Sequence, residues 1–578
     1  MKKIVLCAVN LVFVFYVFSQ TTWHNPLTES YPVIQNQGWT PEIGKTYQRL
    51  PNRAKESVRK AVWNLSENAA GLALHFYTNA EKIEIRYGVT GSHAMAHMPA
   101  TGKSGVDLYA IDSDGKWRVA TDKFNFGDTL TYTFNNLTQS TYHKHGFEYR
   151  LFLPLYNTVK WMEIGVPDSA QFKFIPVLNE KPIVVYGTSI AQGGCASRPG
   201  MGWTNILSRT LDYPVINLAF SGNGPLEKEL VNLMDELDAS LYIFDCLPNM
   251  GALSSEEIVE RTVYGVTKLR EKHHTPILVV DHIGYRNDEL NPSTRESADR
   301  MNTASRQAFD SLVALGVKNI YHLHKDTIGF PNNGCVDYIH PNDLGMQAYA
   351  DAYEKKIRKI LNMPIGNINT TNPVSQRREP DIYEWKERHQ NILKNVQLQR
   401  PKKVIIGNSI THYWGGEPGR ENGSQSWHHQ MKPIGFFNLG YGWDKIENVL
   451  WRVYHGELDG YEADDVVLMI GTNNLDANTH DEIVEGLQFL LNQIEIRQPK
   501  AKIKVVGLLP RRGRESEIKQ INEQISNMAL RNNYIFLDVD DKLLTRNDVI
   551  DETLFLDGLH PNEKGYSLIV NDIIKSSR

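Results

Sequence analysis

Cysteine is scarce in this sequence. Four cysteines occur in 578 residues, and no two of them have the CxxC spacing of a structural zinc site. Cys7 lies within an apolar stretch near the N-terminus, which leaves Cys195, Cys246 and Cys335 for the rest of the chain. Three thiols are too few to hold a chain of this length together, so a disulfide-rich scaffold is excluded.

A large net charge is also missing. The formal charge is -5 at pH 7, and charged residues make up 22% of the chain. Lysine and arginine form neither the basic face typical of nucleic-acid binding nor a polybasic patch for acidic lipids. We therefore expect a mildly acidic globular protein with no nucleic-acid partner.

The N-terminus carries an apolar run that is too short to span a membrane. Lys2 and Lys3 precede the apolar residues 4–18. A short charged segment followed by an apolar segment of this length is typical of a secretory signal peptide. We expect residues 1–20 to be a signal peptide, and the mature protein to be secreted or periplasmic without stable membrane insertion.

Length and pattern predict several domains, because 578 residues exceed what one hydrophobic core serves. Between about residues 22 and 174, short alternating segments are separated by turn residues, and no helical pattern intervenes. This pattern predicts a β-sandwich over residues 21–175. The expected strands are residues 82–87, 105–111, 131–134, 149–153 and 159–164.

From Pro182 onward, strand and helix patterns alternate, which predicts an α/β fold with a mostly parallel sheet. Residues 366–380 are polar and are expected to form a linker, after which a helix and a second α/β pattern follow. We therefore predict α/β domains at residues 176–365 and 381–578. The expected strands are 183–186, 215–219, 241–244, 276–281 and 319–323, then 404–406, 436–439, 466–470, 503–508 and 534–537.

Matching polar residues follow the strands of both α/β domains, at the edge where open parallel sheets bind ligands. In both domains the histidine follows the serine by 151 residues (340 less 189, and 560 less 409). Equal spacing over that distance indicates a duplicated site. The residues are Ser189, Asn249, Asp337 and His340 in the first domain, and Ser409, Asn473, Asp557 and His560 in the second.

These residue types together predict acyl transfer. A serine hydroxyl is a weak nucleophile that needs a base, and the base needs an acceptor that fixes its tautomer. The two histidines are the candidate bases, and the aspartates three residues before them are the candidate acceptors. The side-chain amides of the two asparagines can donate to the oxyanion. No GxSxG elbow surrounds either serine, so the α/β-hydrolase arrangement is not expected.

The blocks around these residues resemble the SGNH (GDSL-type) hydrolases, which are flavodoxin-like three-layer enzymes. The resemblance implies further oxyanion donors, Gly222 in the first domain and the backbone amide of Trp443 in the second. The N-terminal region, with its Gly105-Val-Asp-Leu-Tyr109 segment, resembles the GxDLY domain that precedes SGNH domains in secreted bacterial esterases. The second domain resembles the platelet-activating-factor acetylhydrolase subgroup in residues 407–409, 438–442, 447–452, 471–474, 507–511 and 557–561.

Two departures from the family pattern bear on the sites. Trp443 stands where the family has glycine, so we expect its amide to remain a donor and its indole to narrow the pocket. In the first domain, the asparagine block reads Leu247-Pro-Asn-Met250 instead of Gly-x-Asn-Asp, which implies weaker support for Asn249.

The positions of two cysteines near the first site suggest a disulfide bond. Cys195 follows Ser189 closely, and Cys335 comes just before Asp337, so both thiols are expected beside this site. We favour a disulfide between them, with free buried thiols as the alternative.

No motif indicates a metal or a cofactor. The pair His428-His429 and the pair His322 and His324 lack the carboxylate spacing of a metal site. We expect neither a metal nor a cofactor in this protein.

Together these patterns predict a serine esterase with two SGNH catalytic units behind a β-sandwich. The expected substrate is an acylated carbohydrate or another small ester, with O-acetyl groups of a plant or algal polysaccharide or its oligosaccharides favoured. A lipid or thioester hydrolase of the lysophospholipase type is one alternative. A carbohydrate-binding protein with one or both sites vestigial is another. The sugar, the ring position and the oligomeric state stay open at this point.

Overall fold

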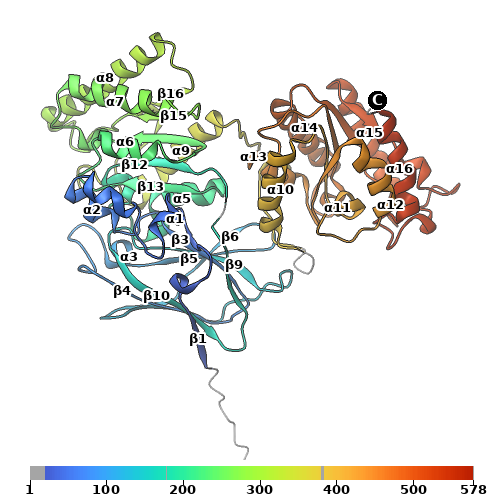
Figure 1. The fold of residues 1–578 in the computed structure, drawn as a ribbon, viewed down its shortest axis with the longest axis horizontal. Helices are drawn as coiled ribbons and strands as arrows, with labels where there is room; N and C mark the ends of the chain where they lie inside the picture. Colours follow the sequence, from blue (N-terminus) through green and yellow to red (C-terminus); the bar gives the residue numbers. More distant parts are fainter. Residues whose placement is uncertain (1–19, 178, 379–382, 577–578) are drawn as a thin grey trace, which may run out of the picture.

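The structure is a computed structural model that describes residues 20–177, 179–378 and 383–576 (Figure 1). It contains an N-terminal region of two antiparallel sheets, followed by two regions that each have one parallel sheet. Apart from residue 20, the expected signal peptide lies outside the described residues. Within the described ranges, no helix combines the length and the apolar character needed to cross a membrane.

The N-terminal region is built from strands with alternating burial. In β8 (Leu130–Phe134), Leu130, Tyr132 and Phe134 are buried, because every second side chain of a strand points to the same face. Apolar side chains of both sheets form one cluster. The first sheet consists, in spatial order, of β1 (Thr21–His24), β10 (Val159–Pro167), β4 (Ile83–Val89), β8 and β7 (Lys123–Phe126). The second consists of β11 (Phe172–Phe174), β3 (Ala73–Thr78), β9 (Phe147–Phe152), β5 (Asp107–Ile111) and β6 (Trp117–Ala120), with β2 (Ile34–Gln35) beside β3.

Short helices occur in this region, whereas its sequence pattern predicted strands without intervening helices. They face the neighbouring α/β region: Trp39, Val62 and Trp63 are buried in the same apolar cluster as Val184 of its parallel sheet. Packing against that sheet therefore explains α1 (Thr40–Ile43) and α2 (Lys60–Ser66). In α3 (Ala100–Lys103), Thr101 Oγ1 donates to the carbonyl of Ser197 in the α/β region at 2.7 Å.

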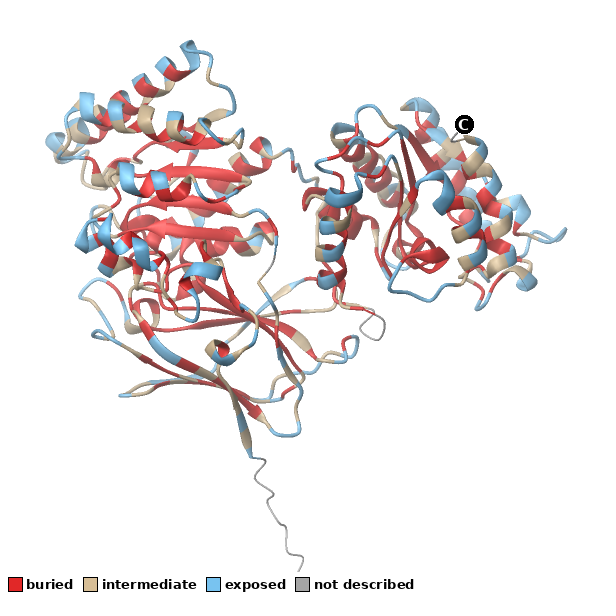
Figure 2. Cartoon of the chain, viewed as in Figure 1, coloured by how far each residue is buried: buried red, intermediate tan, exposed pale blue. Residues whose placement is uncertain are grey.

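The first α/β region has a parallel sheet with apolar clusters on both faces, and its strands are among the most thoroughly buried parts of the chain (Figure 2). Such burial explains why its strands are continuous apolar runs. In spatial order they are β13 (Val215–Ala219), β12 (Ile183–Gly187), β14 (Leu241–Asp245), β15 (Ile277–Val280) and β16 (Ile320–Leu323). The helices are α4 (Ser189–Gln192), α5 (Trp203–Leu211), α6 (Lys228–Met234), α7 (Ser255–Arg270), α8 (Pro292–Ala314) and α9 (Asp343–Ile360).

The second α/β region repeats this strand order, as the internal duplication predicts. In spatial order the strands are β18 (Phe436–Gly440), β17 (Lys403–Gly407), β19 (Asp465–Met469), β20 (Lys502–Val506) and β21 (Ile535–Leu537). The helices are α10 (Trp385–Gln399), α11 (Ser409–Gly415), α12 (Ser424–Ser426), α13 (Ile446–Tyr454), α14 (His480–Arg497), α15 (Glu515–Arg531) and α16 (Glu563–Ser576).

Buried charges join the three regions. Arg150 of β9 lies 2.8 Å from the carboxylate of Asp212, which follows α5, and Lys386 of α10 lies 3.2 Å from the same carboxylate. Between the two α/β regions, Nδ1 of His455 lies 2.7 Å from Oε2 of Glu180. A buried charge is costly without its partner, so these pairs favour one relative placement of the three regions.

Candidate active sites

Each candidate nucleophile begins a short helix directly after a central strand. Ser189 is the first residue of α4 after β12, and Ser409 is the first residue of α11 after β17. The N-cap residues Thr188 and Asn408 accept a hydrogen bond from the backbone of the new helix, which fixes the turn. Both serine side chains therefore emerge at the carboxyl edge of their sheet.

The first serine, histidine and aspartate form a hydrogen-bonded chain. Ser189 Oγ lies 2.9 Å from His340 Nε2, and His340 Nδ1 lies 2.7 Å from Asp337 Oδ2. The other carboxylate oxygen of Asp337 accepts from the backbone amides of Ile339 and His340, at 2.8 and 2.7 Å. Partial burial opposes ionisation of Asp337, but the hydrogen bonds from His340 and Ile339 outweigh it and lower the pKa of the carboxyl.

The second chain has the same geometry. Ser409 Oγ lies 2.8 Å from His560 Nε2, and His560 Nδ1 lies 2.7 Å from Asp557 Oδ2. Asp557 also accepts from the backbone amides of Leu559 and His560. As in the first site, partial burial is outweighed by these hydrogen bonds, and the pKa of Asp557 is lowered. Both histidines thus face an ionised carboxylate on one side and a serine hydroxyl on the other.

The two residues expected to hold the oxyanion in the first site are Gly222 and Asn249. Gly222 has a φ of 66°, a left-handed conformation that glycine adopts at little cost. The backbone amide of Gly224 donates to Asn249 Oδ1 at 3.0 Å. Because Oδ1 is used in this way, Nδ2 is the end of the Asn249 amide that can donate to a substrate oxygen.

The second site places a tryptophan in the same conformation. Trp443 has a φ of 65°, although bulky residues rarely adopt this backbone conformation. The residue is 48% exposed, so its indole does not fill a core. Asn473 Nδ2 donates to the backbone carbonyl of Asp444 at 2.9 Å, which ties the asparagine to the loop that carries Trp443.

Matching asparagines tie the loop of each expected oxyanion donor, here termed the oxyanion loop, to the helix that carries the serine. Asn217 Nδ2 donates to the carbonyl of Ala191 at 2.7 Å, and Asn438 Nδ2 donates to the carbonyl of Thr411 at 2.8 Å. Each loop therefore keeps its place relative to the nucleophile through a buried amide.

Two arginines that no sequence motif revealed support these loops from outside the sheets. Arg49 of the N-terminal region donates to the carbonyl of Ala219 at 2.8 Å, and Arg388 of α10 donates to the carbonyl of Gly440 at 3.0 Å. Each guanidinium also lies over the aromatic ring of the next loop residue, at 4.9 and 4.8 Å from its centroid. The carbonyls occupy equivalent positions at the ends of β13 and β18, so unrelated segments supply the same support.

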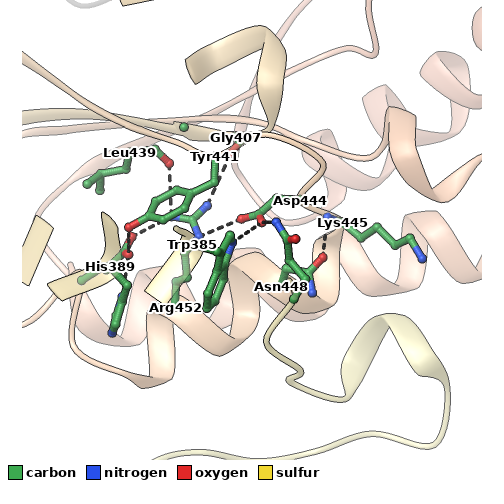
Figure 3. A network of polar contacts seen from close by, with 12 residues as sticks. Trp385, His389, Gly407, Leu439, Tyr441, Asp444, Lys445, Asn448 and Arg452 are labelled. Carbon is green, nitrogen blue, oxygen red and sulfur yellow. Dashed lines mark hydrogen bonds and ion pairs between the residues drawn. The ribbon is translucent and has the colours of Figure 1, made fainter. Parts of the chain in front are cut away.

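A buried network holds the loop of the second site in place (Figure 3). Arg452 Nε donates to Asp444 Oδ2 at 2.8 Å, and Trp385 Nε1 donates to Asp444 Oδ1 at 2.8 Å. Arg452 also donates to the carbonyl of Leu439 at 3.1 Å and pairs with Glu457 at 2.6 Å. Burial raises the pKa of Asp444 to about 6, against the effect of the arginine.

The disulfide expected between Cys195 and Cys335 is absent, because both cysteines are free thiols. Cys195 Sγ lies within 4.8 Å of ring nitrogens of His97 and His340. Burial raises the pKa of Cys195 to about 12 and that of Cys335 to about 11, so both thiols stay protonated and unreactive. The disulfide prediction was therefore wrong, and the alternative of free thiols holds.

Besides that group of a thiol and two imidazoles, one further cluster among the described residues could hold a metal ion. It joins His322 and His324 with Asp281, a carboxylate that follows a neighbouring strand and that sequence spacing did not reveal. Asp281 already forms an ion pair with Arg306. The expectation of a metal-free protein stays a prediction.

The buried carboxyl group of Asp245, at the end of β14, is expected to make the stability of the protein depend on pH. Burial raises the pKa of Asp245 to about 6 from the ordinary value of about 3.9. Because folding disfavours the charged form, the contribution of this group to stability is complete below about pH 4. It is lost as the pH rises through 6.

We therefore expect Asp245→Asn to raise the free energy of unfolding at pH 8 by about 2 to 3 kcal/mol and to leave it nearly unchanged at pH 4. Urea unfolding of both proteins at the two pH values measures the difference. An equal change at both pH values would show that ionisation of Asp245 is not its cause.

Comparison with known proteins gives three family matches. Residues 180–358 and residues 405–568 each match a model of the GDSL-like lipase/acylhydrolase family, and residues 21–172 match the N-terminus of SGNH-hydrolase-type esterases. Residues 359–404, which include α10, lie between the two matches to the GDSL-like family.

Individual relatives agree with these matches. A solved structure from Bacteroides ovatus ATCC 8483, described as a GDSL-like lipase, is 34% identical, with a TM-score of 0.54; the match covers 59% of this chain and 98% of that chain. Platelet-activating factor acetylhydrolase IB subunit alpha2 from Homo sapiens is 28% identical over 190 residues, which are 32% of this chain and 80% of that protein. The alpha1 subunit from Homo sapiens is 27% identical over 188 residues, or 32% of this chain and 78% of that protein.

Proposed function

This chain belongs to the GDSL-like lipase/acylhydrolase family, and from that premise we propose that it is a serine esterase with two working SGNH catalytic units. The observation that carries the proposal is the presence of two hydrogen-bonded chains of serine, histidine and aspartate, each at the carboxyl edge of a parallel sheet. Such chains activate a serine hydroxyl towards an ester carbonyl.

In the first site, Ser189 Oγ attacks the ester carbonyl while His340 Nε2 takes the hydroxyl proton. Asp337 holds the Nδ1–H of His340 and stabilises the imidazolium. The oxyanion is held by the Gly222 backbone amide and by Nδ2 of Asn249. In the second site Ser409, His560 and Asp557 take the same three roles, with Trp443 and Asn473 as the donors.

The acyl-enzyme then forms and is hydrolysed by water, with the same histidine transferring the protons. When the tetrahedral intermediate collapses, the bond to the alcohol oxygen breaks and the histidine returns the proton to that alcohol. A water molecule next attacks the acyl carbonyl and gives its proton to the histidine. Collapse of the second intermediate releases the carboxylic acid and restores the serine hydroxyl.

For the substrate, we propose short acyl groups on carbohydrate, most of all O-acetyl groups of polysaccharides or oligosaccharides. Support comes from two exposed aromatic rings beside the second site: Trp443 and Tyr142 are both 48% exposed and both lie over the Arg378 guanidinium. Exposed, amphipathic rings of this kind suit the mixed polar and apolar faces of a sugar. The expected export of the protein fits a substrate outside the cell.

One observation favours a second candidate, a lipid esterase. The motifs of the second α/β region resemble the platelet-activating-factor acetylhydrolase subgroup, and the alpha2 subunit from Homo sapiens is 28% identical to this chain over 190 residues. A phospholipid with a short acyl chain would then be the substrate of Ser409. A carbohydrate-binding protein with vestigial sites remains the alternative from another functional class.

We further propose the finer architecture and location expected from the sequence. The single apolar cluster shared by the two N-terminal sheets supports a β-sandwich over residues 21–175. Apolar clusters on both faces of the first parallel sheet support a three-layer arrangement. We place the two SGNH domains at residues 176–365 and 381–578, and the mature protein outside the cytoplasm.

The test compares substrates on proteins in which only one site can react. Acetate release from acetylated xylan, from acetylated pectin and from an acetylated lysophospholipid is measured for Ser189→Ala and for Ser409→Ala. Each variant is expected to keep turnover of at least one carbohydrate ester by its remaining serine. Loss of all turnover in either single variant would contradict two working sites, and turnover of the phospholipid alone would replace the carbohydrate proposal.

A further inference from the structure

Residues 374–378, which we term the strap, connect all three regions of the protein. Ser375 Oγ donates to Asp212 Oδ2 of the first α/β region at 2.9 Å. Arg377 Nε donates to Glu148 Oε2 of the N-terminal region at 2.5 Å, and both of these side chains are 2% exposed. The sequence of residues 366–380 predicts a polar linker here. The contacts hold the strap between the N-terminal region and the first α/β region.

Between these two anchors, Gln376 reaches the second active site. Its Nε2 donates to the carbonyl of Gly442 at 2.9 Å and to Asp444 Oδ1 at 3.0 Å. Its Oε1 accepts from the backbone amide of Arg378 at 2.6 Å, and the side chain is buried. Gly442 and Asp444 are the two neighbours of Trp443. A single side chain is therefore hydrogen-bonded on both sides of the residue whose backbone amide is the proposed oxyanion donor.

The conformation of this loop explains why such support is needed. Trp443 has the left-handed backbone of a glycine, and a conformation of this kind persists only where the surroundings impose it. A small displacement of the Trp443 amide would move the donor away from the oxyanion, whose stabilisation depends strongly on distance.

In the first site a glutamine has a comparable role, but it comes from the α/β region itself. Gln192 Oε1 accepts from the backbone amide of Ser221 at 2.9 Å, and its Nε2 donates to the carbonyl of Leu155 in the N-terminal region at 3.2 Å. Ser221 precedes the oxyanion glycine as Gly442 precedes Trp443. In both sites, therefore, a glutamine binds the residue before the oxyanion donor and links it to another region. In the first site the glutamine belongs to the α/β region itself, and in the second it belongs to the strap.

From these contacts we propose that Gln376 is a positioning residue for the second active site, and that the strap makes this site depend on the docking of the other two regions. The inference rests on the proposed esterase function of Ser409. Gln376 touches no substrate in this scheme; it acts through Gly442 and Asp444 on the amide of Trp443.

The test uses full-length Ser189→Ala protein, in which only the second site turns over an aryl acetate. Gln376→Met keeps the length of the side chain and removes both donors and the acceptor. We expect kcat to fall by about 10-fold to 100-fold, because small displacements of catalytic groups have effects of this size. KM is expected to stay close to that of the Ser189→Ala parent, since no contact with the substrate is removed.

Gln390→Met is the matched control. Gln390 of α10 accepts from the backbone amide of Asn179 at 2.8 Å and donates to Glu180, so it also bridges two regions, but it does not touch the oxyanion loop. Its kcat in the Ser189→Ala background is expected to equal that of the parent. A loss equal to that of Gln376→Met would show that any weakened contact between regions lowers activity, which would overturn the specific role of Gln376.

Combining Gln376→Met with Ser409→Ala allows turnover by the first site to be measured alone. Turnover by Ser189 is expected to be unchanged. Equal losses at both sites, or an unchanged kcat at Ser409, would each overturn the inference. Absence of turnover already in the Ser189→Ala parent would instead overturn the proposed function of the second site, and the inference with it.

Discussion

Replacing Ser189 and Ser409 together by alanine is expected to lower kcat for ester hydrolysis by about a million-fold, to nearly the background rate. In the proposed mechanism each Oγ bonds to the substrate carbonyl, and the two Oγ atoms lie 2.9 and 2.8 Å from their histidine nitrogens. Among the residues that the structure describes, no other hydroxyl takes part in either hydrogen-bonded chain. Without the serine oxygen the covalent intermediate does not form, so the oxyanion donors have no charge to stabilise.

The measurement is single-turnover and steady-state hydrolysis of an aryl acetate by the double variant, with Ser254→Ala as control. Ser254 caps the N-terminus of α7, so its loss is expected to cost about 1 kcal/mol of stability without changing kcat. If the double variant kept activity comparable to the parent, the nucleophilic role of both serines would be refuted.

Changing Asp337 to asparagine is expected to lower kcat at the first site by about 10,000-fold, measured in Ser409→Ala protein. The asparagine Oδ1 can keep the hydrogen bonds from the backbone amides of Ile339 and His340, so the loop retains its shape. Its amide nitrogen would then face His340 Nδ1 and donate to it. His340 would carry its proton on Nε2, where it cannot accept the proton of the serine.

The corresponding change at the second site is Asp557→Asn in Ser189→Ala protein, and a similar loss is expected. Thermal unfolding of both variants should match that of their parents, because the backbone hydrogen bonds are retained. Activity within about tenfold of the parent would mean that the histidine keeps its tautomer without the carboxylate, and the orienting role would have to be abandoned.

The sequence predicted well those features that depend on near neighbours in the chain. The α/β strands were recognisable because burial on both faces requires continuous apolar runs. The aspartate and histidine of each site are three residues apart, so one loop brings them together at 2.7 Å. The N-terminal helices were missed because their apolar residues, such as Trp63, pack against a sheet formed much later in the chain.

The disulfide prediction failed for a related reason. Spacing placed Cys195 and Cys335 near the first site but carried no information on the direction of their side chains. In the structure, Cys195 is grouped with His97 and His340, and both thiols are free. The carboxylate of Asp281 was overlooked beside His322 and His324 because it comes from another strand.

By itself, the sequence determined the family, the duplication and the identity of the candidate nucleophiles, bases and carboxylates, because these are carried by residue types in local motifs. Only the tertiary structure decided what holds each oxyanion loop: Arg49 and Gln192 in the first site, and Arg388 and Gln376 in the second. These side chains bond to backbone groups of the loops. Every residue type carries a backbone carbonyl, and every type except proline a backbone N–H, so the contacts leave no motif in the sequence and exist only once distant segments are folded together.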